Sequence, residues 1–218
     1  MIDFDPRFTE VVFLDIECYV PPEDQQKSKG SMIYNPANTG HFVLGGVFRR
    51  AFPRQSKMEP PWQVWNWAKE DEKATLQQIY NYFNESWKMI EGRTANHPDL
   101  ILVGTGISRH DVPTLYVRSV LYKIDTEMAL YETYFKTKIV DLCDVGIALF
   151  RNKPNMYSLY PKTSNALKSR LGIQGRKISG KSVWELYEAQ QFDAIKERTA
   201  SEVEEIIEIA SRITSGKF

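Results

Sequence analysis

Short apolar runs, bounded by polar or glycine-containing segments, recur through the first two thirds of the chain. Runs of this length that contain β-branched and aromatic residues are typical of strands. The run at 99–104 has no alternation, which predicts a strand buried on both faces. Gly45 and Gly46 indicate a bulge or a close approach of another segment. The pattern predicts an opening strand within 11–19, with its apolar run at 11–14, and further strands at 42–48, 63–67 and 99–104. Residues 138–142 fit either a fifth strand or the start of a helix.

Apolar residues at three- and four-residue spacing predict helices between and after these strands. Residues 71–91 show this spacing over five turns, and the last third of the chain is mainly helical. The final helix, at 197–213, carries one apolar stripe with acidic residues on its other faces. The stripe consists of Val203, Ile206, Ile207, Ala210 and Ile213. Further helices are predicted at 112–122, 126–135, 163–171 and 183–187.

This order of elements predicts an α/β fold in which three antiparallel strands are followed by parallel additions to a mixed, five-stranded sheet. The chain has 218 residues, enough for a proper core, so 1–218 is expected to form a single domain. Residues 21–40 lack periodicity and are predicted to be an exposed loop insertion. Such a loop either borders a functional site or is a mobile part of the surface.

Composition limits the partners and the compartment. The 28 basic and 28 acidic residues cancel, so any binding of nucleic acid has to use local patches or metal ions rather than a global basic field. Cys18 and Cys143 lack the spacing of a zinc site, and a reducing environment is the default. The N-terminus does not resemble a signal peptide, and no apolar run approaches the roughly 20 residues of a membrane span. The sequence therefore predicts a cytoplasmic protein without membrane contact.

Asp15 and Glu17 directly follow the first apolar run. Side chains two apart on a strand share a face, and paired like charges are costly unless a cation or a proton compensates them. Carboxylate oxygens suit Mg²⁺ or Mn²⁺. Taken alone, the pair fits a solvent-exposed strand end at least as well as a metal site.

Two further acidic features have ordinary explanations of their own. Asp111 follows the strand at 99–104 and fits the start of a helix, with Pro113 in its first turn. The acids of the last helix fit a solvated face. They are Glu202, Glu204, Glu205 and Glu208.

In order, these segments resemble the motifs of the DEDD 3′-to-5′ exonucleases, and in particular predicted exonucleases related to the proofreading domain of family-B DNA polymerases. Residues 13–17, Phe-Leu-Asp-Ile-Glu, resemble the first motif, and Val103 to Leu115 resembles the second. Glu202-Val203 falls at the third. Between them, 139–142 resembles an Asp-Leu segment, and 167–187 is similar to a Leu-Gly, then Val-Trp-x-Leu-Tyr, stretch. The resemblance covers roughly residues 10–212.

The resemblance implies an RNase H-like fold and a two-metal mechanism on the single-stranded 3′ ends of DNA or RNA. By position, the catalytic residues and metal ligands would be Asp15, Glu17, Asp111 and Glu202, with two Mg²⁺ or Mn²⁺ ions as cofactors. The sequence does not choose between DNA and RNA.

The chain departs from the family pattern at four positions. Thr105 replaces an Asn and His110 a Phe in the second motif, and Glu202 stands for an Asp. Arg198 occupies the place of a Tyr that positions water, and an arginine cannot act as a neutral partner or base. These departures motivate an alternative: a catalytically impaired exonuclease-like fold that binds nucleic acid, a protein partner or a larger assembly.

Several residues are candidates for contacts with nucleic acid. Arg198 can bind a phosphate, and His110 and Thr105 accompany the second motif. Lys177 and Lys181 belong to the densest basic stretch, which fits a phosphate backbone or a plain exposed surface. Trp62, Trp65 and Trp67 fit base stacking, although aromatic residues at strand alternation more often belong to the core.

Overall fold

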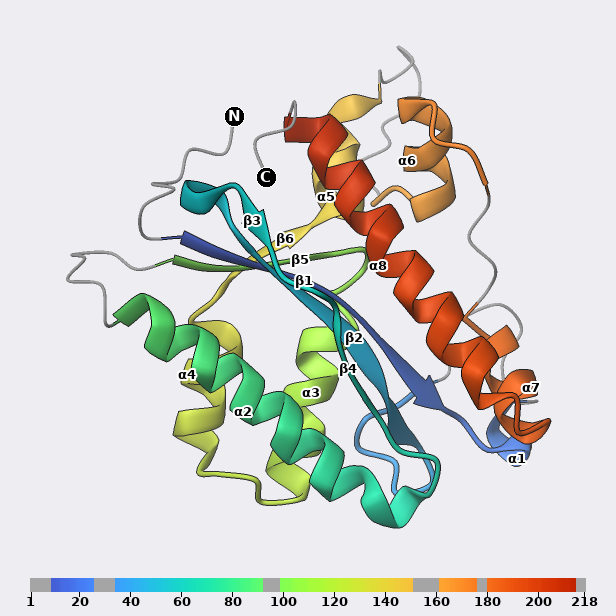
Figure 1. Cartoon of the computed structure of the whole chain (residues 1–218). Coiled ribbons are helices and arrows are strands. Elements are labelled where there is room, and N and C mark those ends of the chain that lie inside the picture. Colours follow the sequence, from blue (N-terminus) through green and yellow to red (C-terminus); the bar gives the residue numbers. More distant parts are fainter. Residues whose placement is uncertain (1–8, 26–33, 92–98, 151–160, 176–179, 215–218) are drawn as a thin grey trace, which may run out of the picture.

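A six-stranded mixed sheet with β1 in its middle organises the fold (Figure 1). The computed structural model describes residues 9–25, 34–91, 99–150, 161–175 and 180–214. The strand order is β3-β2-β1-β5-β6, and β4 pairs with β2 beside that path. The strands are β1 (Thr9–Tyr19), β2 (Phe42–Phe52), β3 (Lys57–Met58), β4 (Trp62–Trp65), β5 (Asp99–Gly104) and β6 (Lys138–Asp141).

The strand directions agree with the predicted mixed sheet. β2 runs antiparallel to both β1 and β4, whereas β5 is parallel to β1 and β6 is parallel to β5. This is an RNase H-like topology. Residues 138–141 form a strand rather than the start of a helix, and the helix begins directly afterwards at Leu142. The pattern did not predict β3, which has only two residues and is too short for any periodicity.

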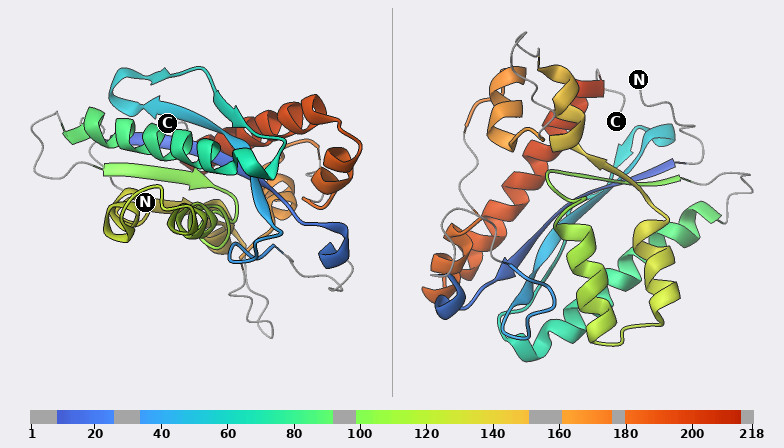
Figure 2. Two further views of the ribbon diagram at one scale, coloured as in Figure 1. Left: turned by 90° about the horizontal axis from the view of Figure 1, so that it is seen from below. Right: turned by 180° about the vertical axis from the view of Figure 1, so that it is seen from behind.

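Helices cover both faces of the sheet (Figures 1 and 2). One face packs against α2, α3 and α4, and the other packs against α8 with α5 and α6 beside it. The helices are α1 (Pro22–Gln25), α2 (Glu72–Glu91), α3 (Asp111–Leu121), α4 (Glu127–Phe135), α5 (Leu142–Val145), α6 (Ser164–Leu171), α7 (Ser182–Glu188) and α8 (Phe192–Thr214). The 3-10 helices are Pro53–Gln55, Lys69–Asp71 and Gly146–Leu149.

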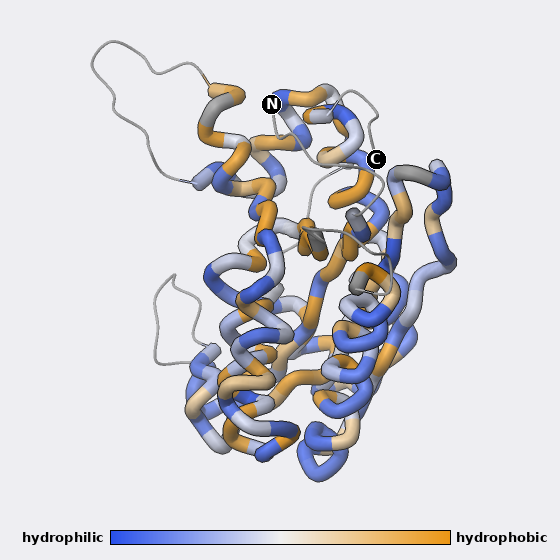
Figure 3. Tube along the Cα trace, turned by 90° about the vertical axis from the view of Figure 1, so that its left-hand side faces the viewer, coloured by the Kyte–Doolittle hydropathy of each residue, from blue (hydrophilic) through white to orange (hydrophobic). Residues whose placement is uncertain are grey.

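Alternation along β1 divides the core in two. Val12, Leu14 and Ile16 point into the cluster formed with α2, α3 and α4, whereas Val11 and Phe13 point toward α8. The hydropathy of the trace follows this arrangement, because apolar strands lie between helices that are polar on their outer sides (Figure 3). Since Asp15 and Glu17 continue the series of Val11 and Phe13, they emerge on the face that α8 covers.

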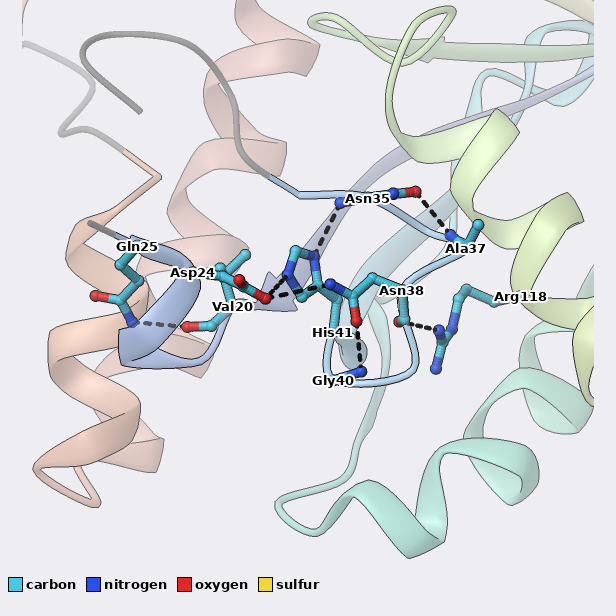
Figure 4. A network of polar contacts seen from close by, with 9 residues as sticks. All are labelled: Val20, Asp24, Gln25, Asn35, Ala37, Asn38, Gly40, His41 and Arg118. Carbon is cyan, nitrogen blue, oxygen red and sulfur yellow. Dashed lines mark hydrogen bonds and ion pairs between the residues drawn. The ribbon is translucent and has the colours of Figure 1, made fainter. Parts of the chain in front are cut away.

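The described parts of the predicted loop at 21–40 are ordered by polar contacts. Residues 22–25 form α1, and 26–33 lie outside the described residues. The buried imidazole of His41 lies between two partners: Nε2 is 3.1 Å from an Asp24 oxygen, and Nδ1 accepts the Asn35 N–H at 2.9 Å. Asn38 donates to the same Asp24 oxygen (Figure 4). This segment is therefore fastened to α1 and β2 and is more than a plain exposed loop.

The last helix is longer than its pattern indicated, because α8 begins at Phe192. Its buried side includes Val203, Ile206 and Ala210 from the predicted stripe. In the part of the chain that the structure describes, no helix is both long and apolar enough to cross a membrane.

Candidate metal centre

Asp15 and Glu17 lie in the second half of β1, where the neighbouring backbone comes unusually close. Asp15 pairs with Val47 and Glu17 with Gly45, and the register then shifts by a bulge. A Cβ added at Gly46 would lie 2.6 Å from the Asp15 carbonyl oxygen. At Gly45, where φ is +140°, a Cβ would lie 2.0 Å from the Val64 carbonyl oxygen. The two glycines therefore permit the tight packing that holds this part of β1, as the sequence indicated.

Glu202 of α8 completes a group of three buried carboxylates. The side chains of Asp15, Glu17 and Glu202 each offer an oxygen, and these oxygens all lie within 4.8 Å of one another. Only 6–7% of each residue's surface is exposed. The donor set fits a hard divalent cation, because it consists of carboxylate oxygens drawn together from a strand and a helix. The fold thus contains a buried acidic triad that could hold a metal ion.

The structure distinguishes Glu202 from the other acids of the last helix. Glu205 forms an ion pair with the buried Lys168 at 2.6 Å. Glu204 and Glu208 lie on the exposed side of α8, where they pair with Arg49 and Arg212 respectively. The solvated-face interpretation holds for Glu204 and Glu208 but is wrong for Glu202.

Arg198 bridges two carboxylates of the triad. Its Nη1 lies 3.0 Å from Glu17 Oε1, and its Nη2 lies 2.7 Å from Glu202 Oε1. Thr199 adds a hydroxyl hydrogen bond of 3.2 Å to the same Glu17 oxygen. Helical spacing puts Arg198 and Glu202 on one side of α8, with Thr199 on the buried side. One corner of the acidic cluster therefore already contains a cation.

Asp111 of α3 contacts the backbone of the same strand. It is the first residue of α3 and only 3% exposed, and its Oδ1 accepts the backbone N–H of Ile16 at 3.3 Å. β5 pairs with β1 only as far as Phe13, so Asp111 satisfies a backbone donor just beyond the end of β5. Asp111 lies outside the group of three, but its carboxylate adjoins the residue between Asp15 and Glu17.

The loop before Asp111 is held by Asp141 at the end of β6. One Asp141 oxygen accepts the N–H groups of Gly106 and Cys143, and the other accepts both the N–H and the hydroxyl of Ser108. This contact gives the Asp-Leu segment a positioning role that the sequence alone did not reveal. Its signals in the sequence were the resemblance of residues 139–142 to the family segment and the position of an acid at the end of a possible strand.

The candidate nucleic-acid contacts have different surroundings. Thr105 is half-buried in the turn after β5, and His110 Nδ1 lies 3.7 Å from Asp111 Oδ1 with its ring against Tyr34. Lys181 is exposed at the start of α7, while Lys177 lies outside the described residues. Arg198 faces the carboxylates. The structure thus brings Arg198, Glu17 and Glu202 together and leaves Lys181 on the surface.

Burial raises the pKa of two groups near the carboxylates, the thiol of Cys18 and the hydroxyl of Tyr34. The pKa of the Cys18 thiol is raised, first by burial and then by the charge of Asp111. Burial likewise raises the pKa of the Tyr34 hydroxyl well above its usual value. Both groups are therefore neutral near pH 7 and add no charge to the carboxylates.

Comparison with protein-family models and with curated proteins finds no match to this chain.

Proposed function

We propose that this protein is a metal-dependent 3′-to-5′ exonuclease that hydrolyses phosphodiester bonds at single-stranded nucleic-acid ends. The observation that carries the proposal is the burial of Asp15, Glu17 and Glu202 within reach of one ion on an RNase H-like sheet. The resemblance of residues 13–17 and 103–115 to exonuclease motifs supports it, because it links the carboxylates to phosphodiester hydrolysis.

The residues that would hold Mg²⁺ or Mn²⁺, two ions in the resembled family, are Asp15, Glu17, Glu202 and Asp111. When bound, such ions supply a Lewis acid that activates water and stabilises the leaving 3′-oxygen. The protein contributes a fixed set of oxygens: β1 supplies two of them, α8 the third, and α3 a fourth at the adjoining edge. Their burial limits screening by water, so each charge acts more strongly there than at an exposed site.

A stack of aromatic rings beside the carboxylates supports a single-stranded substrate. Trp65 lies opposite Gly45, which in turn pairs with Glu17. The Trp65 ring stacks on Trp67, and Trp67 stacks on Phe192 at 4.3 Å between centroids. Aromatic surfaces bind unpaired bases with little sequence preference. Thr105, His110, Lys177 and Lys181 remain proposed contacts for the strand, which is DNA or RNA.

A direct test uses end-labelled single strands with Mg²⁺ or Mn²⁺. Wild-type protein should shorten them from the 3′ end, and EDTA should stop the reaction. Asp15→Asn should reduce the rate by more than about 100-fold, because loss of a metal ligand should cost at least as much as loss of its supporting residues. Glu208→Gln, on the exposed side of α8, is the matched control and should retain the wild-type rate. Shortening that persists in Asp15→Asn would contradict the proposal.

Arg198 favours a second candidate function, namely nucleic-acid or protein binding by an exonuclease-like fold without turnover. A guanidinium bonded to Glu17 and Glu202 stands where the resembled family has a tyrosine, and it cannot serve as a neutral base. Calorimetry would support this candidate if single strands bind without being shortened. Absence of both binding and shortening would exclude both candidates for nucleic-acid substrates.

A further inference from the structure

The guanidinium of Arg198 has the position and charge of an internal counter-ion. Its two terminal nitrogens contact carboxylates from different elements, Glu17 of β1 at 3.0 Å and Glu202 of α8 at 2.7 Å. All three side chains are largely buried: Arg198 is 12% exposed, Glu17 9% and Glu202 8%. Contacts this short in a poorly hydrated site are strong, and guanidinium geometry suits simultaneous contact with two carboxylates.

Charge balance explains why a cation is needed there. Asp15, Glu17 and Glu202 bring three carboxylates within 4.8 Å of one another, and Asp111 adjoins the same strand. Buried like charges at such distances destabilise the folded state unless a cation offsets them. Arg198 supplies one positive charge from the helix that carries Glu202, so it offsets part of the repulsion without metal.

We infer that Arg198 is a resident cation that competes with divalent metal for Glu17 and Glu202, and that it thereby sets the metal affinity of the site. The inference rests on the proposed metal centre and deepens it. In the metal-free protein the guanidinium holds β1 and α8 together. A divalent ion that binds oxygens of Glu17 and Glu202 has to displace the guanidinium or bind with fewer ligands. Arg198 therefore raises the metal concentration needed to fill the site.

The same helix contains a matched control. Arg212 and Glu208 form another arginine–glutamate pair at four-residue spacing, with a distance of 2.6 Å, but both are exposed. A substitution at Arg212 removes the same type of side chain and the same charge from α8 without touching the triad. Any difference between the two arginine variants then reports the position of Arg198 and not the net charge of the protein.

The experiment measures Mn²⁺ binding by calorimetry, together with thermal melting in EDTA and in Mn²⁺. Arg198→Gln should bind Mn²⁺ at least about tenfold more tightly than the wild type, because a competing charge has been removed. The same variant should melt at a lower temperature in EDTA and recover the loss in Mn²⁺. Arg212→Gln should match the wild type in Mn²⁺ affinity.

A second variant covers the case in which Arg198→Gln does not fold. Arg198→Lys keeps the charge, but a compact ammonium lacks the fork that contacts both carboxylates, so its Mn²⁺ affinity should lie above that of the wild type. Unchanged or weaker affinity in the folded Arg198 variants would overturn the inference while leaving the metal centre in place. Absence of Mn²⁺ binding in the wild type and in every variant would overturn the metal centre as well.

Discussion

The carboxylate of Asp141 determines the conformation of the loop that leads into α3. Its two oxygens accept four hydrogen bonds from Gly106, Ser108 and Cys143, at 2.7–3.1 Å. Asp141 is only 4% exposed, so these donors would otherwise be poorly hydrated. This loop ends at Asp111, the candidate ligand with which α3 begins. Asp141 therefore positions Asp111 indirectly, through the loop.

Asp141→Asn should lower the free energy of unfolding by about 2 kcal/mol, because the amide nitrogen would face an N–H donor and the remaining bonds would lose their charge. Urea denaturation followed by circular dichroism measures this change. Asp144→Asn is the control, since Asp144 is more exposed and contacts the same loop only through the surface residue Arg109 and a longer, 3.4 Å contact with the Ser108 hydroxyl. Its effect should stay within about 0.5 kcal/mol. Equal effects of the two substitutions would contradict the role assigned to Asp141.

At the scale of elements, a buried ion pair joins α2, α3 and β2. Both carboxylate oxygens of Glu72 accept hydrogen bonds from the Arg118 guanidinium. Glu72 Oε1 also accepts the Val43 N–H at 2.8 Å. Arg118 donates in addition to the carbonyl oxygen of Pro36 and to that of Asn38, the latter contact being drawn in Figure 4. The pair therefore fastens the segment before β2 to two helices on the aromatic side of the sheet.

Glu72→Gln should destabilise the protein by about 3–5 kcal/mol, because it leaves the buried Arg118 without its counter-charge. The double variant Glu72→Gln with Arg118→Met should lose less than the sum of the two single variants, as expected for a coupled pair. Denaturant titrations of all three variants give the coupling energy. Asp193→Asn, which removes an exposed pair with Lys196, provides a baseline within about 0.5 kcal/mol. Additive losses would show that Glu72 and Arg118 act separately.

The elements that the sequence predicted best are those with an unbroken apolar pattern. β5 has a continuous apolar run and α2 has one apolar face, and both were expected nearly at their observed bounds. β1 begins two residues before the predicted stretch 11–19, and Asp15 and Glu17 lie on this strand as expected. Asp15, Glu17 and Glu202 could be nominated from motif order, but the contact of Arg198 with Glu17 spans 181 residues and depends on how α8 crosses β1. Local spacing contains no information about such a contact.

For the molecule as a whole, the two faces of the sheet differ in the residues that pack against them. The α8 face carries the acidic triad at one end of an aliphatic core. The opposite face is rich in aromatic residues, with Tyr82 and Phe83 of α2 packed near Phe48 of β2, and Tyr134 of α4 packed on Phe83. Most of the aromatic packing is therefore separate from the charged site, which allows the stability of the fold to be probed independently of the carboxylates.

The buried tyrosines of that aromatic face predict how stability depends on alkaline pH. Burial raises the pKa values of Tyr34, Tyr82 and Tyr134, so these hydroxyls stay protonated in the folded protein when free tyrosine ionises near pH 10. A raised pKa in the folded state gives stability that is fully present below the unfolded pKa and is lost as pH rises above it. The free energy of unfolding should therefore fall steadily above about pH 10.

Absorbance at the tyrosinate band, recorded with circular dichroism during an alkaline titration, tests this expectation. Exposed tyrosines should ionise first without loss of structure, and the buried ones should ionise in a later step that coincides with unfolding. Tyr134 is fully buried on α4. Tyr134→Phe should therefore reduce the late step and leave the early one unchanged. If instead this substitution reduced an early step in the folded protein, the hydroxyl of Tyr134 would be accessible to solvent, and the aromatic face could not be the closed core that its packing indicates.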